Sequence, residues 1–181
     1  MRVIGGKFRH RLLTWPEDQV HIRPTKDRIR EAIFNALNDC TNYKVLDLYA
    51  GSGAMGIEAL SRNAQHSTFV DISKIALKTI KENLISLKIE SSSYHIVAEK
   101  DIEALSNFTK NKEVFDLVIL DPPYKEGKYI EILNIIMNND LLSTNGIIVM
   151  ESDHSLELNF SSFKKVKEYK YGEIFVTILW R

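Results

Sequence analysis

From residue 44 to residue 150 the chain alternates short apolar runs with segments of helical periodicity. This alternation limits the fold more than any other feature, because strands that are apolar throughout must be covered on both faces. Helices between such strands predict a doubly wound α/β domain with a parallel sheet. The expected strands are Lys44–Tyr49, Thr68–Asp71, Tyr94–Val97, Phe115–Leu120 and Gly146–Met150, and the expected helices cover 54–62, 73–88, 101–110 and 127–138.

The end of the chain departs from this alternation. Lys164–Tyr171 and Ile174–Trp180 both have strand character, and only a turn that contains Gly172 separates them. Strands joined so tightly form a hairpin, so two antiparallel strands are expected at the edge of the sheet.

The net charge is zero, but the charges are unevenly distributed. The 181 residues contain 24 Lys and Arg against 24 Asp and Glu. Residues 1–30 contain eight basic and three acidic side chains, a net charge of +5, which leaves 16 basic and 21 acidic side chains, a net charge of −5, in the rest. Such a basic segment is either a solvated surface or an arm that neutralises nucleic-acid phosphates. Charge alone leaves both interpretations open.

The composition argues against several classes of protein. No run of about 18 apolar residues is present that could span a membrane, and the charges near the N-terminus argue against a signal peptide. Cys40 is the single cysteine, so neither an internal disulfide nor a thiolate metal cluster is expected. The five histidines lack metal-ligand spacing, so no metal site is expected. These features predict a cytoplasmic protein without a membrane partner.

The basic N-terminal segment is expected to form a small extension over residues 1–22, before a domain over residues 23–181. Arg2–Ile4 and Phe8–Leu13 flank two glycines and can form a short hairpin. Thr25 is a candidate N-cap for the first helix, whose basic side carries Lys26 and Arg30. The apolar side of this helix carries Ile29, Ile33, Phe34 and Leu37.

The segment VLDLYAGSGAMG (45–56) combines a strand, a glycine-rich turn and a helix start. Gly51, Gly53 and Gly56 match G-x-G-x-x-G, in which the glycines allow a tight turn and a close approach of a nucleotide to the backbone. Asp71 ends the next strand, where a carboxylate can accept hydrogen bonds from both ribose hydroxyls. Asp47 is expected to orient the loop and the amino-acid end of a cofactor. The pattern predicts nucleotide binding, and by itself it suits both a dinucleotide and S-adenosylmethionine.

The tetrapeptide Asp121-Pro122-Pro123-Tyr124 directly follows an expected strand. It therefore lies at the carboxyl edge of the sheet, where ligands of open α/β sheets bind. The Asp121 carboxylate and the Pro122 carbonyl can both accept hydrogen bonds from an exocyclic NH2 group, which aims the nitrogen lone pair at an incoming methyl group. Tyr124 can stack on a base that has left its own stack. The predicted reaction is methyl transfer, which needs positioning more than a strong base.

Both motifs also carry a resemblance. LDLYAGSGAMGIEALSR (46–62) and DPPY (121–124) resemble class I S-adenosylmethionine-dependent methyltransferases that modify amino groups. RVIGGK (2–7) and IRPTKDRIREAIFN (22–35) are similar to the RsmD-type bacterial 16S rRNA guanine-N2 methyltransferases. The resemblance covers nearly the whole chain. It implies a seven-stranded Rossmann-like domain, S-adenosylmethionine as donor, and a guanine N2 amine of 16S rRNA, free or within a 30S subunit, as acceptor. We expect a monomer.

The resemblance also implies roles for particular residues. The expected acceptor site consists of Asp121, Pro122, Pro123 and Tyr124. The expected cofactor site consists of Asp47, Ala50, Gly51, Ser52, Gly53, Asp71, Ile72, Asp101 and Asp121. The expected RNA contacts are Lys7, Arg9, Arg11, Arg23, Thr25 and Arg28, although Arg23 and Arg28 could instead hold the first helix on the domain. Family members tend to carry Gly-Asp or Asn-Ala where this chain has AEKDI (98–102), so the adenine contact falls on Asp101 or, one position earlier, on Lys100.

Three alternatives remain for comparison. An N6-adenine DNA methyltransferase could use the same DPPY site, but such enzymes usually add a target-recognition domain, for which 181 residues leave no room. A nicotinamide-dependent oxidoreductase would leave DPPY unexplained. A non-catalytic RNA-binding module is disfavoured by the two intact motifs. Outside the motifs, Glu151 is either a solvated strand end or a residue of the cleft.

Overall fold

The computed structural model describes residues 1–16, 27–123, 128–156 and 161–181. The predicted site residues Arg23, Thr25 and Tyr124 lie outside these ranges, as does Lys26. The helices are α1 (Asp27–Leu37), α2 (Ala54–Ser61), α3 (Lys74–Ser86), α4 (Asp101–Lys110) and α5 (Tyr129–Asn138), with short 3₁₀ helices η1 (Gly6–Phe8) and η2 (Ser91–Ser93). The strands are β1 (Lys44–Leu48), β2 (His66–Val70), β3 (Tyr94–Val97), β4 (Phe115–Leu120), β5 (Leu142–Ser152), β6 (Lys165–Tyr171) and β7 (Ile174–Trp180).

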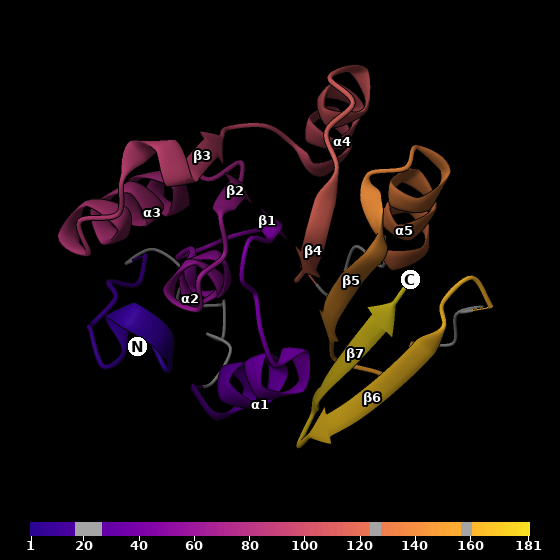
Figure 1. Ribbon diagram of the computed structural model, residues 1–181, viewed down its shortest axis with the longest axis horizontal. Helices are drawn as coiled ribbons and strands as arrows, with labels where there is room; N and C mark the ends of the chain where they lie inside the picture. Colours follow the sequence, from indigo (N-terminus) through magenta and orange to yellow (C-terminus); the bar gives the residue numbers. More distant parts are fainter. Residues whose placement is uncertain (17–26, 124–127, 157–160) are drawn as a thin grey trace.

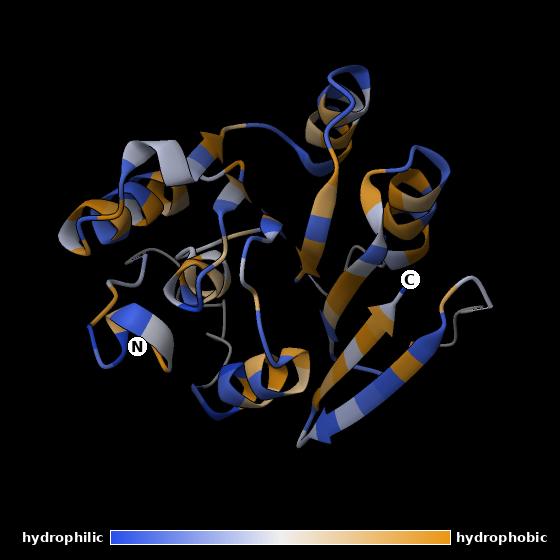
Figure 2. Ribbon diagram, in the orientation of Figure 1, coloured by the Kyte–Doolittle hydropathy of each residue, from blue (hydrophilic) through white to orange (hydrophobic). Residues whose placement is uncertain are grey.

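The strands form one seven-stranded sheet in the order β3-β2-β1-β4-β5-β7-β6 (Figure 1). β1 to β5 are parallel, and β7 pairs antiparallel with both β5 and β6. The prediction of a mostly parallel sheet that ends in an antiparallel hairpin is confirmed. β7 is almost entirely buried, whereas the edge strand β6 is exposed and largely hydrophilic (Figure 2). Hydrophilic side chains on an edge strand discourage pairing with another chain.

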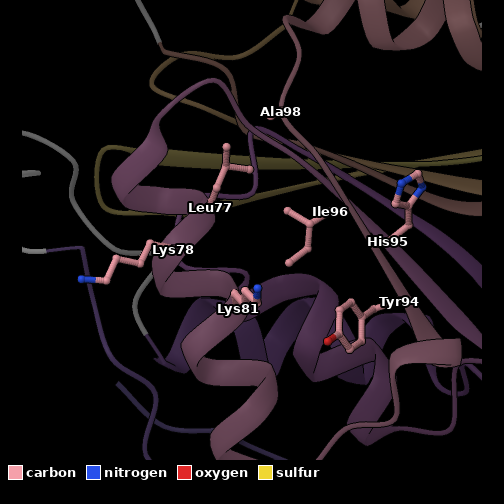
Figure 3. A pocket seen from close by; sticks show the side chains of 7 residues that line it. All are labelled: Leu77, Lys78, Lys81, Tyr94, His95, Ile96 and Ala98. Carbon is pink, nitrogen blue, oxygen red and sulfur yellow. The ribbon is translucent and has the colours of Figure 1, made fainter.

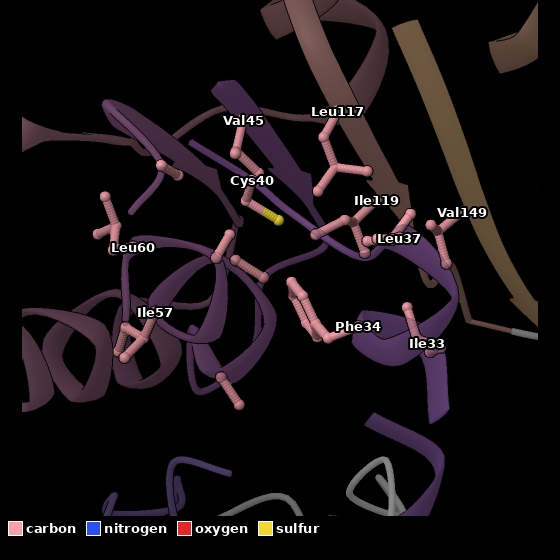
Figure 4. Close-up of a cluster of buried hydrophobic side chains, with 14 of the residues drawn as sticks. Ile33, Phe34, Leu37, Cys40, Val45, Ile57, Leu60, Leu117, Ile119 and Val149 are labelled. Carbon is pink, nitrogen blue, oxygen red and sulfur yellow. The ribbon is translucent and has the colours of Figure 1, made fainter. Parts of the chain in front are cut away.

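Helices cover both faces of the sheet. One apolar cluster joins the sheet to α1, α2 and α3, and a second joins it to α4 and α5. Figure 4 shows part of the first cluster, where Phe34 of α1 lies near Cys40 and Ile119. Burial raises the pKa of the Cys40 thiol to about 12, so this thiol stays protonated at neutral pH. None of the described helices is long and apolar enough to cross a membrane.

The first described helix buries its predicted apolar face but lacks the expected basic side at Arg30. Arg30 is fully buried. Its guanidinium donates to the carbonyl of Arg2 and to Asp27 Oδ1, 3.0 Å away. The prediction of an exposed Arg30 was wrong, because the N-terminal segment covers this side of α1.

Two strand boundaries differ from the predictions in ways that concern the site. β2 ends at Val70, so Asp71 is the first residue beyond the strand. β5 begins at Leu142 rather than Gly146, and its pairing with β4 shifts register between Phe115 and Leu117. The polar residues 143–145 at this irregularity concealed the start of the strand.

Candidate active site

The register of three parallel strands brings the two motifs together. Leu48, the last residue of β1, pairs with Val70 of β2 on one side and with Leu120 of β4 on the other. Each of these three residues is followed directly by part of the predicted site: the glycine-rich turn at residues 49–53 (the glycine loop), Asp71 and Asp121. These parts therefore share one edge of the sheet. The chain thus builds a site at the carboxyl ends of its parallel strands, as expected for this type of sheet.

The three motif glycines have different roles. Gly51 and Gly53 have φ values of 55° and 76°, in the left-handed region that favours glycine. A Cβ on Gly51 would meet no atom within 4 Å, so space is open beside the loop. A Cβ on Gly56 would lie 2.4 Å from Phe69 Cε1 of β2. Gly56 therefore permits close packing of α2 on the sheet, while Gly51 and Gly53 shape the turn.

Two carboxylates hold the glycine loop in place. Asp47 Oδ2 accepts a hydrogen bond from the Gly56 amide at 2.8 Å, and Asp71 Oδ2 accepts one from the Gly51 amide at 2.9 Å. Asp71 Oδ1 also accepts from the Ser73 amide. Burial raises the pKa of Asp47 to about 7 and the charge of Asp71 adds to this shift, although the Gly56 amide opposes it. The bond from Gly56 links Asp47 to the start of α2, directly after the glycine-rich turn.

The acceptor motif lies in an acidic, desolvated environment. Leu120 pairs with Met150 of β5, so Glu151 follows beside Asp121. Burial raises the pKa of Asp121 well above its usual value, and the charges of Glu151 and Asp47 raise it further. Glu151 is 5% exposed, which excludes the solvated strand end. Such an environment favours a positively charged ligand, because each carboxylate is stabilised by an added cation.

Another group of polar side chains lies at the same edge of the sheet, beyond the end of β3. Asp101, 8% exposed, accepts a hydrogen bond from the Tyr49 hydroxyl at 2.5 Å and lies 3.4 Å from Lys128 Nζ. Burial alone would raise the pKa of Asp101, but the hydrogen bonds from Tyr49 and the Ile102 amide, together with Lys128, lower it. Lys100 is exposed at the N-cap of α4. Asp101 rather than Lys100 therefore contacts the glycine loop.

The other predicted cofactor and acceptor residues are found at this edge. Ile72 is 67% exposed immediately after Asp71, so its aliphatic side chain is accessible at this edge. Ala50 and Ser52 are buried inside the loop. Pro122 is buried and Pro123 is exposed.

Four of the predicted RNA contacts lie in the described ranges. Lys7, Arg9, Arg11 and Arg28 are all exposed. In the N-terminal segment, Arg2 and Leu12 pair in one antiparallel bridge, with η1 between them. Further backbone hydrogen bonds join residues 1–3 to residues 10–13, and the segment packs on α2 rather than extending into solvent.

The comparisons with known proteins agree with this geometry. A family model described as "Conserved hypothetical protein 95" matches residues 1–180. Ribosomal RNA small subunit methyltransferase D of Haemophilus influenzae is 33% identical over 84% of this chain and 79% of its own length. The protein of the same name from Escherichia coli K12 is 34% identical over 84% of this chain and 75% of its own length. The chain belongs to the RsmD family of methyltransferases. The resemblance in the sequence is confirmed.

Solved structures of similar proteins share the fold of this RsmD-family chain. The yhhF protein of Escherichia coli is 31% identical, with a TM-score of 0.84 over all of this chain and 97% of its own. The Thermus thermophilus protein TTHA0928 is 26% identical, with a TM-score of 0.82 over 98% of both chains. SMU.776, solved as a complex with SAH, is 15% identical with a TM-score of 0.71 over 88% of this chain and half of its own, which shows the fold alone.

Sequence reasoning missed two polar residues that support the site of this RsmD-family protein. Glu58 of α2 is fully buried and accepts hydrogen bonds from the Ile4 and Gly5 amides at 2.7 and 2.8 Å. Asn83 of α3, 1% exposed, bonds both to Thr14 and to Ser52 of the glycine loop. Glu58 is the one charged residue of α2, and that was the available signal. Nothing in the sequence around Asn83 distinguishes it.

Proposed function

We propose that this protein transfers the methyl group of S-adenosylmethionine to the exocyclic N2 amine of a specific guanine in 16S rRNA. The observation that carries the proposal is the pairing of Leu48 with Leu120, which puts Asp121 and Pro122 beside the glycine loop. A donor in the loop and an amine on the tetrapeptide would then be neighbours. The names of the RsmD relatives, ribosomal RNA small subunit methyltransferases, support rRNA as the acceptor.

The residues at the sheet edge fit S-adenosylmethionine. Asp71 accepts hydrogen bonds from the Gly51 and Ser73 amides but keeps lone pairs for ribose hydroxyls. Exposed Ile72 offers an apolar surface to an adenine, and Asp101 at the start of α4 offers a carboxylate. The open space beside Gly51 admits a ligand close to the backbone. Burial raises the pKa of Asp47 to about 7, so a cationic group of the cofactor beside Asp47 would stabilise its charged form.

The acceptor residues position the amine. The cofactor supplies an electrophilic methyl group on a sulfonium. The Asp121 carboxylate and the Pro122 carbonyl accept the two N–H hydrogen bonds of the guanine amine, which directs its lone pair towards that methyl group. The new N–C bond forms as the S–C bond breaks, and the nitrogen then loses a proton to the Asp121 carboxylate or to water. Tyr124 is proposed to stack on the flipped guanine.

The basic extension is proposed to hold the rRNA. Residues 1–22 and the start of the domain supply Lys7, Arg9, Arg11, Arg23, Thr25 and Arg28. Contacts of Lys and Arg with phosphates fix the register of an RNA without reading its sequence. The proposed enzyme is a cytoplasmic monomer that acts on 16S rRNA, free or in a 30S subunit.

The decisive experiment separates transfer from cofactor binding. Asp121→Ala is expected to abolish methyl transfer to 16S rRNA from a strain that lacks the enzyme, while calorimetry still detects S-adenosylmethionine with nearly wild-type affinity. The matched control is Asp116→Asn, because Asp116 lies on the same strand but bonds the Lys44 amide at the opposite end of β1. A loss of cofactor affinity as large as the loss of transfer would contradict the role of Asp121.

Analysis of the methylated nucleic acid tests which base is the acceptor. Mass spectrometry of digested rRNA is expected to show N2-methylguanine at one position. N6-methyladenine in DNA would instead support the alternative DNA methyltransferase. Binding of NAD without binding of S-adenosylmethionine would overturn the methyltransferase proposal itself.

A further inference from the structure

A hollow of about 540 Å³ lies between α3 and β3, at the end of the sheet opposite β6. Leu77, Lys78 and Lys81 line it from α3, and Tyr94, His95, Ile96 and Ala98 line it from β3 and the residue after it (Figure 3). None of these residues belongs to the glycine loop, to the DPPY motif or to the Asp101 cluster. The hollow is therefore a separate feature from the proposed active site.

The lining combines an apolar floor with a basic rim. Leu77, Tyr94 and Ile96 are partly exposed, so an aromatic ring and two aliphatic side chains remain accessible. Lys78 and Lys81 are exposed at the rim. Lys78 lies 3.8 Å from Glu82, but both side chains are largely solvated, and such pairs contribute little. Among the described residues Lys81 forms no ion pair.

The helix α3 connects this rim to the basic extension and to the proposed cofactor site. At its C-terminal end, the Arg11 guanidinium of the basic extension donates to the Ser86 carbonyl at 3.3 Å. At its N-terminal end, Lys74 follows closely after Asp71 and Ile72 of the proposed cofactor site. Lys74, Lys78 and Lys81 are spaced by four and three residues, so they lie along one side of the helix. A basic path thus runs along α3 from the extension to the catalytic edge.

We propose that the hollow binds an unpaired nucleotide of the substrate RNA, outside the site of the methylated guanine. The base stacks on Tyr94 and contacts Leu77 and Ile96, while the adjoining phosphates pair with Lys78 and Lys81. Stacking platforms beside basic side chains are the usual means by which proteins hold single-stranded RNA. This inference rests on the proposed function, because it takes RNA as the substrate.

Two sets of variants test the two halves of this site. Tyr94→Leu keeps an apolar side chain but removes the aromatic ring, and it is expected to weaken binding of a 16S rRNA transcript about tenfold. The double variant Lys78→Ala/Lys81→Ala is expected to reduce the slope of log K against log salt concentration by roughly 1.4, about 0.7 for each lost phosphate contact. Calorimetric affinity for S-adenosylmethionine should stay at the wild-type value in both, which verifies that the fold and the cofactor site are intact.

The matched control is Lys164→Ala/Lys167→Ala, which removes the same charge from the exposed region of β6 at the opposite edge of the sheet. The proposal is overturned if the α3 double variant shows the same salt slope as this control, or if Tyr94→Leu binds the transcript as the wild type does. Failure of the wild-type chain itself to bind or methylate 16S rRNA would instead contradict the proposed function. If Tyr94→Leu fails to fold, the lysine variants alone decide.

Discussion

The side chain of Asn83 supports the glycine loop through Ser52: its Nδ2 donates to the Ser52 carbonyl at a distance of 3.0 Å. The same amide donates to the Thr14 carbonyl at 3.0 Å and accepts from the Thr14 amide at 2.8 Å. Asn83 and Ser52 are both almost completely buried, so the Ser52 carbonyl would not regain this bond from water if Asn83 were removed. One side chain therefore links the proposed cofactor loop to the basic N-terminal segment.

Replacement of Asn83 by alanine should weaken cofactor binding and the fold together. Asn83→Ala leaves the Ser52 carbonyl and both Thr14 groups without their partner, so we expect the free energy of unfolding to fall by about 1–3 kcal/mol. Because Ser52 belongs to the loop, we also expect the dissociation constant for S-adenosylmethionine to rise several-fold in calorimetry. Asn107→Ala is the control. It removes a hydrogen bond from the side-chain amide of Asn107, on α4, to the Glu99 carboxylate. Equal cofactor affinity in the two variants would contradict the link.

Loss of Glu58 should release the N-terminal segment from α2. Its carboxylate binds the Ile4 and Gly5 amides and also pairs with Arg62 Nε at 2.9 Å. Its loss leaves both amides and the partly exposed Arg62 guanidinium without this partner, at a cost of about 1–3 kcal/mol. For Glu58→Ala we expect faster amide exchange at Ile4 and Gly5 and earlier proteolysis near the N-terminus.

The control for this variant is Glu103→Ala, since Glu103 is exposed on α4. Unchanged exchange at the two amides in Glu58→Ala would show that other contacts hold the segment.

Much of the fold was predictable because its determinants are local. α4 begins and ends at the predicted residues, and β7 does too. Apolar periodicity defines such elements without knowledge of their neighbours. The motif residues were equally accessible, because glycine spacing and a proline-rich strand end are visible in the sequence. The parallel order of the strands then brings them to one edge.

The roles of several polar residues could not be predicted, because these depend on contacts across the fold. Arg30 lies on the side of α1 opposite the apolar residues, where a side chain is usually exposed, yet the N-terminal segment covers it. Glu151 is buried because β5 pairs beside β4 in the register that sets it next to Asp121. Glu58 and Asn83 bond to residues more than 50 positions away in the chain. Such contacts have no local sequence pattern.

The raised pKa of Asp47, about 7, predicts a specific pH dependence of stability. An unfolded Asp titrates near pH 4, so between about pH 4 and pH 7 the folded chain retains a proton that the unfolded chain has lost. The free energy of unfolding should therefore fall as pH rises through this range. Asp121 contributes with the same sign.

Substitution of Asp47 by asparagine should remove part of this pH dependence. The amide oxygen of Asn can still accept from the Gly56 amide, but the side chain cannot ionise. In urea denaturation we expect Asp47→Asn to be more stable than wild type at pH 8, by on the order of 2 kcal/mol, and to lose less stability between pH 5 and pH 8. Asp116→Asn serves as the control. Parallel pH profiles for wild type and Asp47→Asn would refute the assignment.

Neutralising Arg9 and Arg11 should weaken RNA binding in a salt-dependent manner. Both side chains are exposed on the N-terminal segment, which the Glu58 and Asn83 contacts fix to the domain. Each phosphate contact favours binding because it releases counterions. Arg9→Gln/Arg11→Gln should therefore reduce the slope of log K for 16S rRNA against log salt concentration by about one to two. Cofactor affinity should not change, because neither arginine contacts the glycine loop in the described part of the chain. Lys164→Ala/Lys167→Ala again controls for net charge. If the arginine variant and this control bind rRNA with the same affinity and slope, the N-terminal segment is not the RNA contact, and the charge asymmetry has another cause.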